Sequence, residues 1–313
     1  MRSGPCIAVS ALLALSVTSC RKAENSTQPT SIKSHILYML GASPQESQIV
    51  PLYMSKTRML VMLRVGHSAP VPVVFDTGTN ENLLDLGLAN SLHLPQIGQS
   101  TAVDGSTGKP VPGYDTFLRS ASLSGVPIQD GPAVAVAYDQ GDEIGIFGPN
   151  SFPGKLVRLE STENRLSILP ILPENQPSCT PYRYLGVEDD ALPSADIEVG
   201  DLKIPAILDT GNDSPIILPL EYIAKLPLEK APVQIGYAYS AAGRQPLLSG
   251  RLNGTMKIGP KNLEHPEIHF MKGGRPNIGF PILRELTIIM DPTGHRDWVL
   301  SPADAHDACS SRQ

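Results

Sequence analysis

Charged residues are scarce in this chain of 313 residues. Lys, Arg, Asp and Glu together make up 18% of it, and the formal net charge is −6. Because no basic stripe is present, no nucleic-acid partner is expected. The low charge, together with 27 Gly and 30 Pro, favours short strands and many turns over long surface helices. Since 41% of positions are hydrophobic, the chain is still able to bury one sizeable core or two related ones.

Several common catalytic motifs are missing. G-x-S-x-G does not occur. The letters GSTGK (105–109) resemble the end of a phosphate-binding loop, but the first Gly of that motif would fall on Val103 and Pro110 follows the Lys. Ser106 and Lys109 have the S-x-x-K spacing of serine acylases, yet no helix is expected there. These segments are therefore not interpreted as a nucleotide site or a serine nucleophile.

The N-terminal apolar run, residues 7–17, is too short to span a bilayer comfortably and follows the positive charge of Arg2. Residues 1–19 are interpreted as an export signal that is cleaved. The run ends in VTSC (17–20), which resembles the bacterial lipobox, so Cys20 is expected to carry a lipid anchor to a bacterial membrane, periplasmic or at the cell surface. The alternative is an ordinary secretory signal with a coincidental Cys20. Both interpretations export the protein.

Only four cysteines occur in the chain. Cys6 would leave with the signal and Cys20 would be acylated. Cys179 and Cys309 then remain as a pair in a compartment that permits disulfides, and a bridge between them is one interpretation. Two free or separately buried thiols are the other, because sequence alone does not fix the distance between them.

The most informative pattern is a repeat. The stretch VVFDTGTN (73–80) has a twin in AILDTGN (206–212), and Asp209 follows Asp76 by 133 positions. The apolar segment that contains Gly148 has a counterpart 131 positions later, at Gly279. Landmarks that recur at one period predict a duplicated unit.

The repeat gives the expected domain organisation. Residues 20–48 are polar and fit a tether. The first lobe is expected at 49–171, a Pro-rich linker at 172–186, the second lobe at 187–303 and a tail at 304–313. Within both lobes, short apolar or alternating runs such as MLVMLRV, VPVVF, AVAVAY, AILD, GTMKIG and LTIIMD indicate strands. Helix is expected only at 86–94 and 220–226, so the fold class is all-β.

The two aspartates stand at the ends of apolar strands, where burial favours the neutral carboxyl and costs stability without structural benefit. A single Asp-Thr-Gly is often an ordinary turn. If the two repeats pair about a pseudo-twofold axis, however, Asp76 and Asp209 meet and hold one proton between them. The ionised member is then able to take a proton from water while the protonated member donates to a carbonyl oxygen. This arrangement predicts amide hydrolysis without a covalent intermediate.

At these residues the sequence resembles the aspartic proteases, and each half is similar to a retropepsin-like domain. The resemblance covers about 49–303 and implies two β-barrel lobes in one chain, a peptide or protein substrate, no cofactor and no metal, with a monomer sufficient for the site. It implies that Asp76 and Asp209 are the catalytic pair. The supporting residues it implies are the threonines that lock the two loops together and the glycines beneath and beside the carboxyls: Thr77, Thr210, Gly78, Gly211, Gly148 and Gly279.

The chain departs from the family at three positions. Thr79 and Asn212 stand after DTG, where the family usually has Ala or Ser, and Asn277 replaces an apolar residue before Gly279. Thr79 keeps a hydroxyl near the pair. Asn212 introduces an amide that either tunes the pKa values of the pair or impairs it.

Two further segments carry expectations. The resemblance implies hairpin flaps, and the candidates are 101–115 and 235–248, with tips at Gly105 to Gly108 and at Ala241 to Arg244, around Gly243; plain surface hairpins are the alternative. His265 and His269 in HPEIH flank Glu267, but Pro266 rules out helical metal-ligand spacing, so this pair is interpreted as polar surface or an edge strand.

The sequence therefore predicts an exported, lipid-anchored aspartic endopeptidase. A catalytically impaired peptide-binding lipoprotein with the same fold is the alternative, and Asn212 speaks mildly for it. A purely structural lipoprotein is disfavoured, because a buried carboxylate pair is costly to keep without use.

Overall fold

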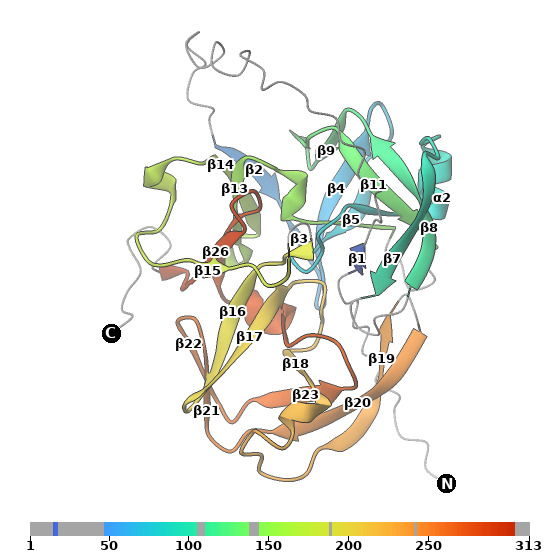
Figure 1. Ribbon diagram of the computed structural model, residues 1–313. Coiled ribbons are helices and arrows are strands. Elements are labelled where there is room, and N and C mark those ends of the chain that lie inside the picture. The colour runs from blue at the N-terminus through green and yellow to red at the C-terminus, as the bar shows by residue number, and fades with distance from the viewer. Residues whose placement is uncertain are drawn as a thin grey trace.

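A computed structural model describes residues 15–17, 47–104, 110–137, 144–187, 190–240 and 243–303. Within these ranges nearly all regular structure is β, arranged in sheets of eleven, six and nine strands. Figure 1 shows a first lobe at the upper right, a second lobe at the bottom and the six-stranded sheet at the upper left. The all-β prediction is confirmed.

The first lobe is built on the eleven-stranded sheet, whose order is β1-β7-β8-β11-β6-β12-β5-β4-β9-β10, with β3 paired to β4. Its strands are β1 (Leu15–Val17), β3 (Tyr53–Met54), β4 (Met59–Val65), β5 (Val71–Phe75), β6 (Leu83–Asp85), β7 (Gly98–Asp104), β8 (Pro110–Leu118), β9 (Ala121–Leu123), β10 (Val126–Pro127), β11 (Gly131–Val136) and β12 (Gly145–Phe147).

The second lobe is built on the nine-stranded sheet, ordered β19-β20-β23-β18-β24-β17-β16-β21-β22. From β7 and β19 onward the two orders match strand for strand. The strands are β16 (Ser194–Val199), β17 (Leu202–Asp209), β18 (Ile216–Pro219), β19 (Val233–Ser240), β20 (Gly243–Arg251), β21 (Thr255–Ile258), β22 (Lys261–Glu264), β23 (Glu267–Met271) and β24 (Asn277–Gly279).

Sequence patterning explains these strands. β4 alternates buried and less buried residues along MLVMLRV, and β21 alternates exposed and buried residues along TMKI, so each turns one face to the core. The three residues of β5 nearest Asp76 and the last four of β17 are all buried. Such continuous burial is typical of central strands with a parallel neighbour, and both strands have one, in β12 and β24 respectively.

The six-stranded sheet joins the lobes in the order β15-β26-β25-β13-β14-β2. Strands β13 and β25 pair at its centre, with Val157 opposite Met290, so each lobe contributes a hairpin to one continuous sheet. Its strands are β2 (Gln48–Pro51), β13 (Lys155–Glu160), β14 (Arg165–Pro170), β15 (Tyr182–Arg183), β25 (Thr287–Asp291) and β26 (Arg296–Leu300). Part of the expected linker 172–186 therefore belongs to a sheet, because Tyr182 pairs with Asp297.

Helices are short. The expected helix at 86–94 is α2 (Leu86–Ser91), capped by the Asp85 side chain, which accepts from the N–H groups of Gly87 and Leu88. It ends early, and His93 has a positive φ of 52°. The expected helix at 220–226 is reduced to the 3-10 turn η5 (Leu220–Tyr222). The remaining pieces are α3 (Phe280–Leu283), η1 (Pro149–Ser151), η2 (Ser161–Glu163) and η3 (Pro173–Asn175).

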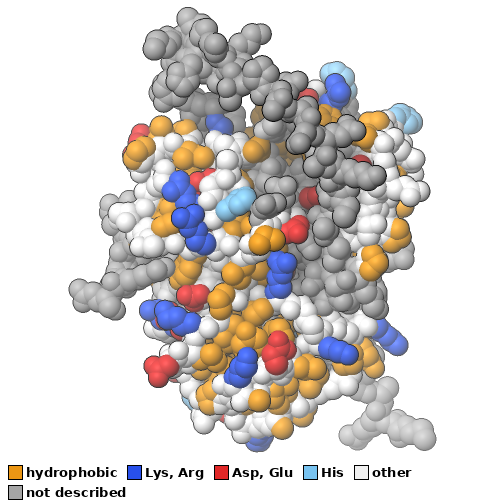
Figure 2. Space-filling view, in the orientation of Figure 1, with side chains coloured by type: hydrophobic (Ala, Val, Ile, Leu, Met, Phe, Trp, Pro, Cys, Tyr) orange, Lys and Arg blue, Asp and Glu red, His pale blue; other side chains and the backbone are white. Residues whose placement is uncertain are grey.

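One hydrophobic core runs through both lobes, and Phe75, Phe147, Phe270 and Phe280 are among its largest fully buried side chains. Figure 2 shows hydrophobic side chains over the lower lobe, among charges of both signs. In the described part of the chain, no helix is long and apolar enough to cross a membrane.

Most of the N-terminal segment lies outside the described residues, including Cys20. Within the expected export signal, β1 pairs antiparallel with β7, and Val17 stands opposite Ala102. Cys179 is disulfide-bonded. Its expected partner Cys309 lies in the tail beyond residue 303, outside the described residues.

Candidate active site

The two DTG loops follow two central strands and meet between the lobes. Asp76 comes directly after β5, and its N–H donates to the carbonyl of Phe147 on β12 at 2.9 Å. Asp209 is the last residue of β17 and lies opposite Gly279 of the parallel strand β24. The exposed fractions of Asp76 and Asp209 are 1% and 0%. Equivalent strands thus carry the two carboxyls into one buried place.

Thr77 and Thr210 interlock the two loops. The N–H of Thr77 donates to Oγ1 of Thr210 at 3.0 Å, and the N–H of Thr210 donates to Oγ1 of Thr77 at 3.1 Å. Each hydroxyl then donates across the interface to a backbone carbonyl, from Thr77 to Leu208 at 2.6 Å and from Thr210 to Phe75 at 3.0 Å. Four buried hydrogen bonds therefore hold the loops in register.

Gly78 and Gly211 allow the carboxyls to approach the opposite loop. A Cβ on Gly78 would lie 2.6 Å from Cγ of Asp209, and one on Gly211 would lie 2.7 Å from Cγ of Asp76. Only glycine fits at either position without a shift of a carboxyl. The same residues supply donors, because Gly78 N–H donates to Oδ1 of Asp76 at 2.7 Å and Gly211 N–H donates to Oδ1 of both aspartates, at 3.1 and 2.9 Å.

Gly148 and Gly279 lie behind the two loops. A Cβ on Gly148 would meet the carbonyl oxygen of Asp76 at 2.8 Å, and one on Gly279 would meet the carbonyl oxygen of Asn212 at 2.8 Å. The structure therefore places both glycines where the chain passes close against a DTG loop.

Electrostatics couple the two aspartates. Burial raises the pKa of Asp76, and burial together with the charge of Asp76 raises the pKa of Asp209 well above its ordinary value. The carboxyls lie within hydrogen-bonding reach of each other. Repulsion between two carboxylates acts on both members, so the pair as a unit holds one proton over a range of pH in which isolated aspartates would both be ionised.

A chain of amides supports Asp209. Asn277 Nδ2 donates to Oδ2 of Asp209 at 2.5 Å, Asn212 Nδ2 donates to Oδ1 of Asn277 at 2.8 Å, and the N–H of Ser214 donates to Oδ1 of Asn212 at 2.9 Å. All four residues are buried. The sequence had marked Asn212 and Asn277 as departures, but the contact between Asn277 and Asp209 was missed. The signal in the sequence that could have indicated this contact is the presence of two amide side chains, Asn212 and Asn277, where the aspartic proteases usually have other residues.

The Thr79 side chain bonds within its own loop. Its hydroxyl donates to the carbonyl of Glu81 at 2.7 Å, so it closes the turn of its own loop. A Cβ on Gly148 would lie only 2.7 Å from Cγ2 of Thr79, so this side chain also leaves no room for a larger residue at position 148.

His269 corrects the interpretation of HPEIH. It lies on β23, between β18 and β20, and is only 7% exposed, so for this residue the expectation of polar surface or an edge strand is wrong. Its Nδ1 lies 3.0 Å from Oγ of Ser214, and its Nε2 lies 3.3 Å from Oε1 of Glu267. His265 is exposed and lies 3.1 Å from Glu229. Among the described residues, no group of His, Cys, Asp and Glu has the arrangement of a metal site.

The expected flaps are hairpins in both lobes. β7 and β8 pair from Gly98 opposite Asp115 to Val103 opposite Pro110, and β19 and β20 pair up to Ser240 opposite Gly243. In Figure 1 the tip ends of both hairpins lie on the right, between the lobes. Gly105 and Gly108 lie outside the described residues, as do Ala241 and Ala242. Gly243 begins β20, and Arg244 lies over the ring of Tyr237 at 4.8 Å.

A cavity of about 490 Å³ lies beside the first loop. One part of the cavity is lined by residues 79–82, which directly follow Gly78. Another part is lined by Ala191 and Pro193, just before the second lobe's first strand, and by the turn before β26. The lining includes Thr79, Asn80, Asn150, Tyr184, Pro193 and His295.

Comparison with known proteins supports an aspartyl protease family. The family model described as aspartyl protease matches residues 61–150, which contain the first DTG loop and Gly148. The curated proteins that were compared include no match to this chain. At the coarse level, the match and the all-β lobes support a protease of the aspartyl, retropepsin-like class.

Proposed function

We propose that this protein is an aspartic endopeptidase whose single active site is formed by Asp76 and Asp209 from the two lobes of one chain. The observation that carries the proposal is the meeting of two buried carboxyls on interlocked DTG loops. Two buried carboxyls without a use would only cost stability, so their retention at a lobe interface favours chemistry. The matching strand orders support the proposal that the second lobe repeats the first.

The proposed reaction uses one proton held by the pair. The ionised carboxylate takes a proton from a water molecule as the water oxygen bonds to the peptide carbonyl carbon, and the protonated carboxyl gives its proton to the carbonyl oxygen. The resulting gem-diol collapses as the C–N bond breaks. The proton taken from water passes to the leaving nitrogen, and the other carboxyl regains its proton from the gem-diol. The products are a carboxylic acid and an amine.

The N–H groups of Gly78 and Gly211 hold the carboxyls in place for this reaction, and the threonine contacts keep the two loops from separating. Such positioning lowers the cost of bringing two groups to one substrate carbonyl. The β7–β8 and β19–β20 hairpins are proposed to close over an extended peptide.

The direct test is cleavage of a peptide library by purified residues 23–313 at several pH values, with products read by mass spectrometry. Wild type should cleave, and neither Asp76→Asn nor Asp209→Asn should. An active variant of either kind would place the chemistry elsewhere. Binding of peptides without cleavage by the wild type would replace the peptidase proposal with a peptide-binding role.

We also propose that the protein is exported and anchored by lipid at Cys20. The basis is the sequence of residues 1–20 alone. Wild type should fractionate with membranes and Cys20→Ser should be soluble in the exported fraction. Unchanged fractionation of the variant would remove the support for a lipid anchor.

A further inference from the structure

The amides behind Asp209 form a directed relay. This relay consists of Asn277, Asn212 and the backbone N–H of Ser214, and it ends on Oδ2 of Asp209. A backbone N–H is only able to donate, so the atom of Asn212 that faces Ser214 is its oxygen. The amide nitrogen of Asn212 then donates to Asn277, which fixes the oxygen of Asn277 as the acceptor. The nitrogen of Asn277 is thereby directed at Asp209.

The direction of the relay fixes the state of one carboxyl oxygen. If Oδ2 of Asp209 carried a proton, its O–H would face the N–H of Asn277, and two donors would meet in a buried place. Asn277 is unable to turn its oxygen toward Asp209 without losing Asn212, and Asn212 is held by Ser214. Oδ2 of Asp209 is therefore an acceptor whenever the relay is intact.

The two carboxyls differ in how their oxygens are supported. Asp209 receives an N–H on each oxygen, from Gly211 on Oδ1 and from Asn277 on Oδ2. Asp76 receives both of its N–H contacts on Oδ1, from Gly78 and Gly211. Its Oδ2 is buried, and no N–H among the described residues reaches it. An ionised Asp76 would depend on a proton held by Asp209 for a donor to its second oxygen, whereas an ionised Asp209 has an N–H on both oxygens.

We propose that the relay assigns the roles within the pair: Asp209 is the ionised member that takes the proton from water, and Oδ2 of Asp76 carries the proton given to the substrate. Asn277 and Asn212 are positioning residues in this account. The inference rests on the proposed peptidase function and deepens it.

The relay belongs to one lobe only. The twin of Asn277 in the first lobe is Ile146, and the twin of Asn212 is Thr79, whose hydroxyl bonds to Glu81. Neither offers Asp76 the amide that Asp209 receives. In a site built from two similar loops, this difference breaks the symmetry between the carboxyls.

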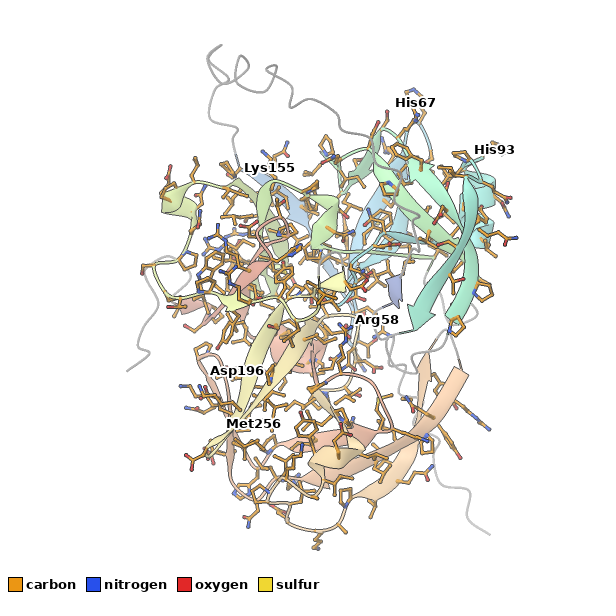
Figure 3. The ribbon with its side chains drawn as sticks, viewed as in Figure 1. Arg58, His67, His93, Lys155, Asp196 and Met256 are labelled. Atoms are coloured by element: carbon orange, nitrogen blue, oxygen red, sulfur yellow. The ribbon has the colours of Figure 1, made fainter. Side chains whose placement is uncertain are left out.

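Charged groups and hydrogen bonds around the pair act on both carboxyls. The hydrogen bonds from Gly78 and Gly211 and, by a smaller effect, the charge of the buried Arg58 lower the pKa of Asp76 and so oppose the assignment. The pKa of Asp209 is also raised further than that of Asp76; the assignment rests instead on the N–H contacts of the two carboxyls. Figure 3 shows Arg58 between the two lobes. On the other side, His269 contacts Ser214 and Glu267 and reaches the relay only through Ser214. Burial lowers the pKa of His269, so it is neutral at neutral pH.

The assignment is tested by the pH dependence of kcat/KM in the Asn277→Ile variant, which places the first-lobe residue in the second lobe. The acid limb reports the first ionisation of the pair and the alkaline limb the second. If the single charge lies on Asp209, Asn277 stabilises the singly and doubly ionised pairs alike. Its removal should then raise the acid limb by roughly one to two pH units, the effect of one hydrogen bond to a charged group, and leave the alkaline limb in place.

The opposite assignment predicts the opposite result. If the single charge lies on Asp76, Asn277 meets an ionised Asp209 only in the doubly ionised pair. Its removal would raise the alkaline limb and leave the acid limb in place, and this outcome would overturn the proposal. Limbs that both stay in place in a folded variant would overturn it as well, since Asn277 would then be only structural.

Two further variants complete the experiment. Asn212→Thr keeps Asn277 but frees its amide to turn, so the acid limb should move in the same direction by a smaller amount; this variant decides the matter if Asn277→Ile does not fold. Ser151→Ala is the matched control, because it removes a buried 2.8 Å hydrogen bond to Asn82 in the first lobe. It should lower stability without moving either limb.

A second readout separates this inference from the proposed function. The carboxyl carbons of 13C-labelled aspartates are titrated by NMR, and the signals of the pair are assigned by their loss in Asp76→Asn and Asp209→Asn. The same shift of the lower titration step is expected in Asn277→Ile. If wild type cleaves no peptide, the peptidase proposal fails, while the titration still decides which aspartate is ionised.

Discussion

Replacing either aspartate with asparagine should abolish catalysis, but the two variants should differ in stability. In Asp76→Asn, the new Oδ1 is able to accept from Gly78 and Gly211 as the carboxylate does, and the NH2 takes the place of Oδ2, which no N–H reaches among the described residues. In Asp209→Asn, both oxygen positions receive an N–H, from Gly211 and from Asn277, and only one oxygen remains.

The expected difference follows from this count. Both variants remove the repulsion and part of the burial cost of the pair, so Asp76→Asn should be as stable as wild type or more stable near neutral pH. Asp209→Asn additionally turns one buried hydrogen bond into a contact between two donors, which costs about 1–3 kcal/mol. Asp209→Asn should therefore be less stable than Asp76→Asn by about that amount.

The assay is urea unfolding at pH 7, followed by fluorescence of the single tryptophan, Trp298, which is buried in the six-stranded sheet that both lobes share. Asp201→Asn, in an exposed turn, is the matched control and should lie within about 0.5 kcal/mol of wild type. Combining Asp209→Asn with Asn277→Ile should cancel most of the deficit, because the second change removes the opposed donor. Equal stability of the two asparagine variants would refute the hydrogen-bond assignment.

Two other predictions concern stability. Burial raises the pKa of Asp297 well above its ordinary value of 3.8, so the unfolded chain loses this proton first and the wild type loses stability as pH rises from about 4. Asp297→Asn should therefore gain stability relative to wild type between about pH 4.5 and 7.5. A difference in Tm that stays constant over this range would contradict the prediction. Thr77→Val leaves the N–H of Thr210 and the carbonyl of Leu208 buried without partners, so the free energy of unfolding should fall by about 2–4 kcal/mol. Thr77→Ser keeps the hydroxyl and should stay near wild type. Equal unfolding midpoints for the Val and Ser variants would argue against the interlock.

Local patterns predicted much of this fold. The runs MLVMLRV and VPVVF coincide with β4 and β5. The run AILD forms the end of β17, and LTIIMD contains β25. The reason is physical: alternation and continuous burial are properties of a strand and its immediate neighbours. The repeat of DTG at one period also predicts that Asp76 and Asp209 form a pair.

Contacts between distant segments were not predictable in the same way. Tyr182 lies in a Pro-rich stretch that reads as a linker, and only its pairing with Asp297 makes it a strand. His269 looks like surface in HPEIH until β18 and β20 cover it on both sides. Asn277 and Asp209 are 68 residues apart, and their contact depends on the parallel pairing of β17 with β24.

The central claim, one active site made from two lobes of one chain, is tested most directly by the stoichiometry of an active-site inhibitor. A statine peptide, which places a hydroxyl where the attacking water would lie, is titrated into monodisperse protein by calorimetry. We expect one inhibitor per chain in the wild type and a large loss of affinity in both Asp76→Asn and Asp209→Asn. One inhibitor per two chains, or binding that is unchanged in either variant, would contradict the account.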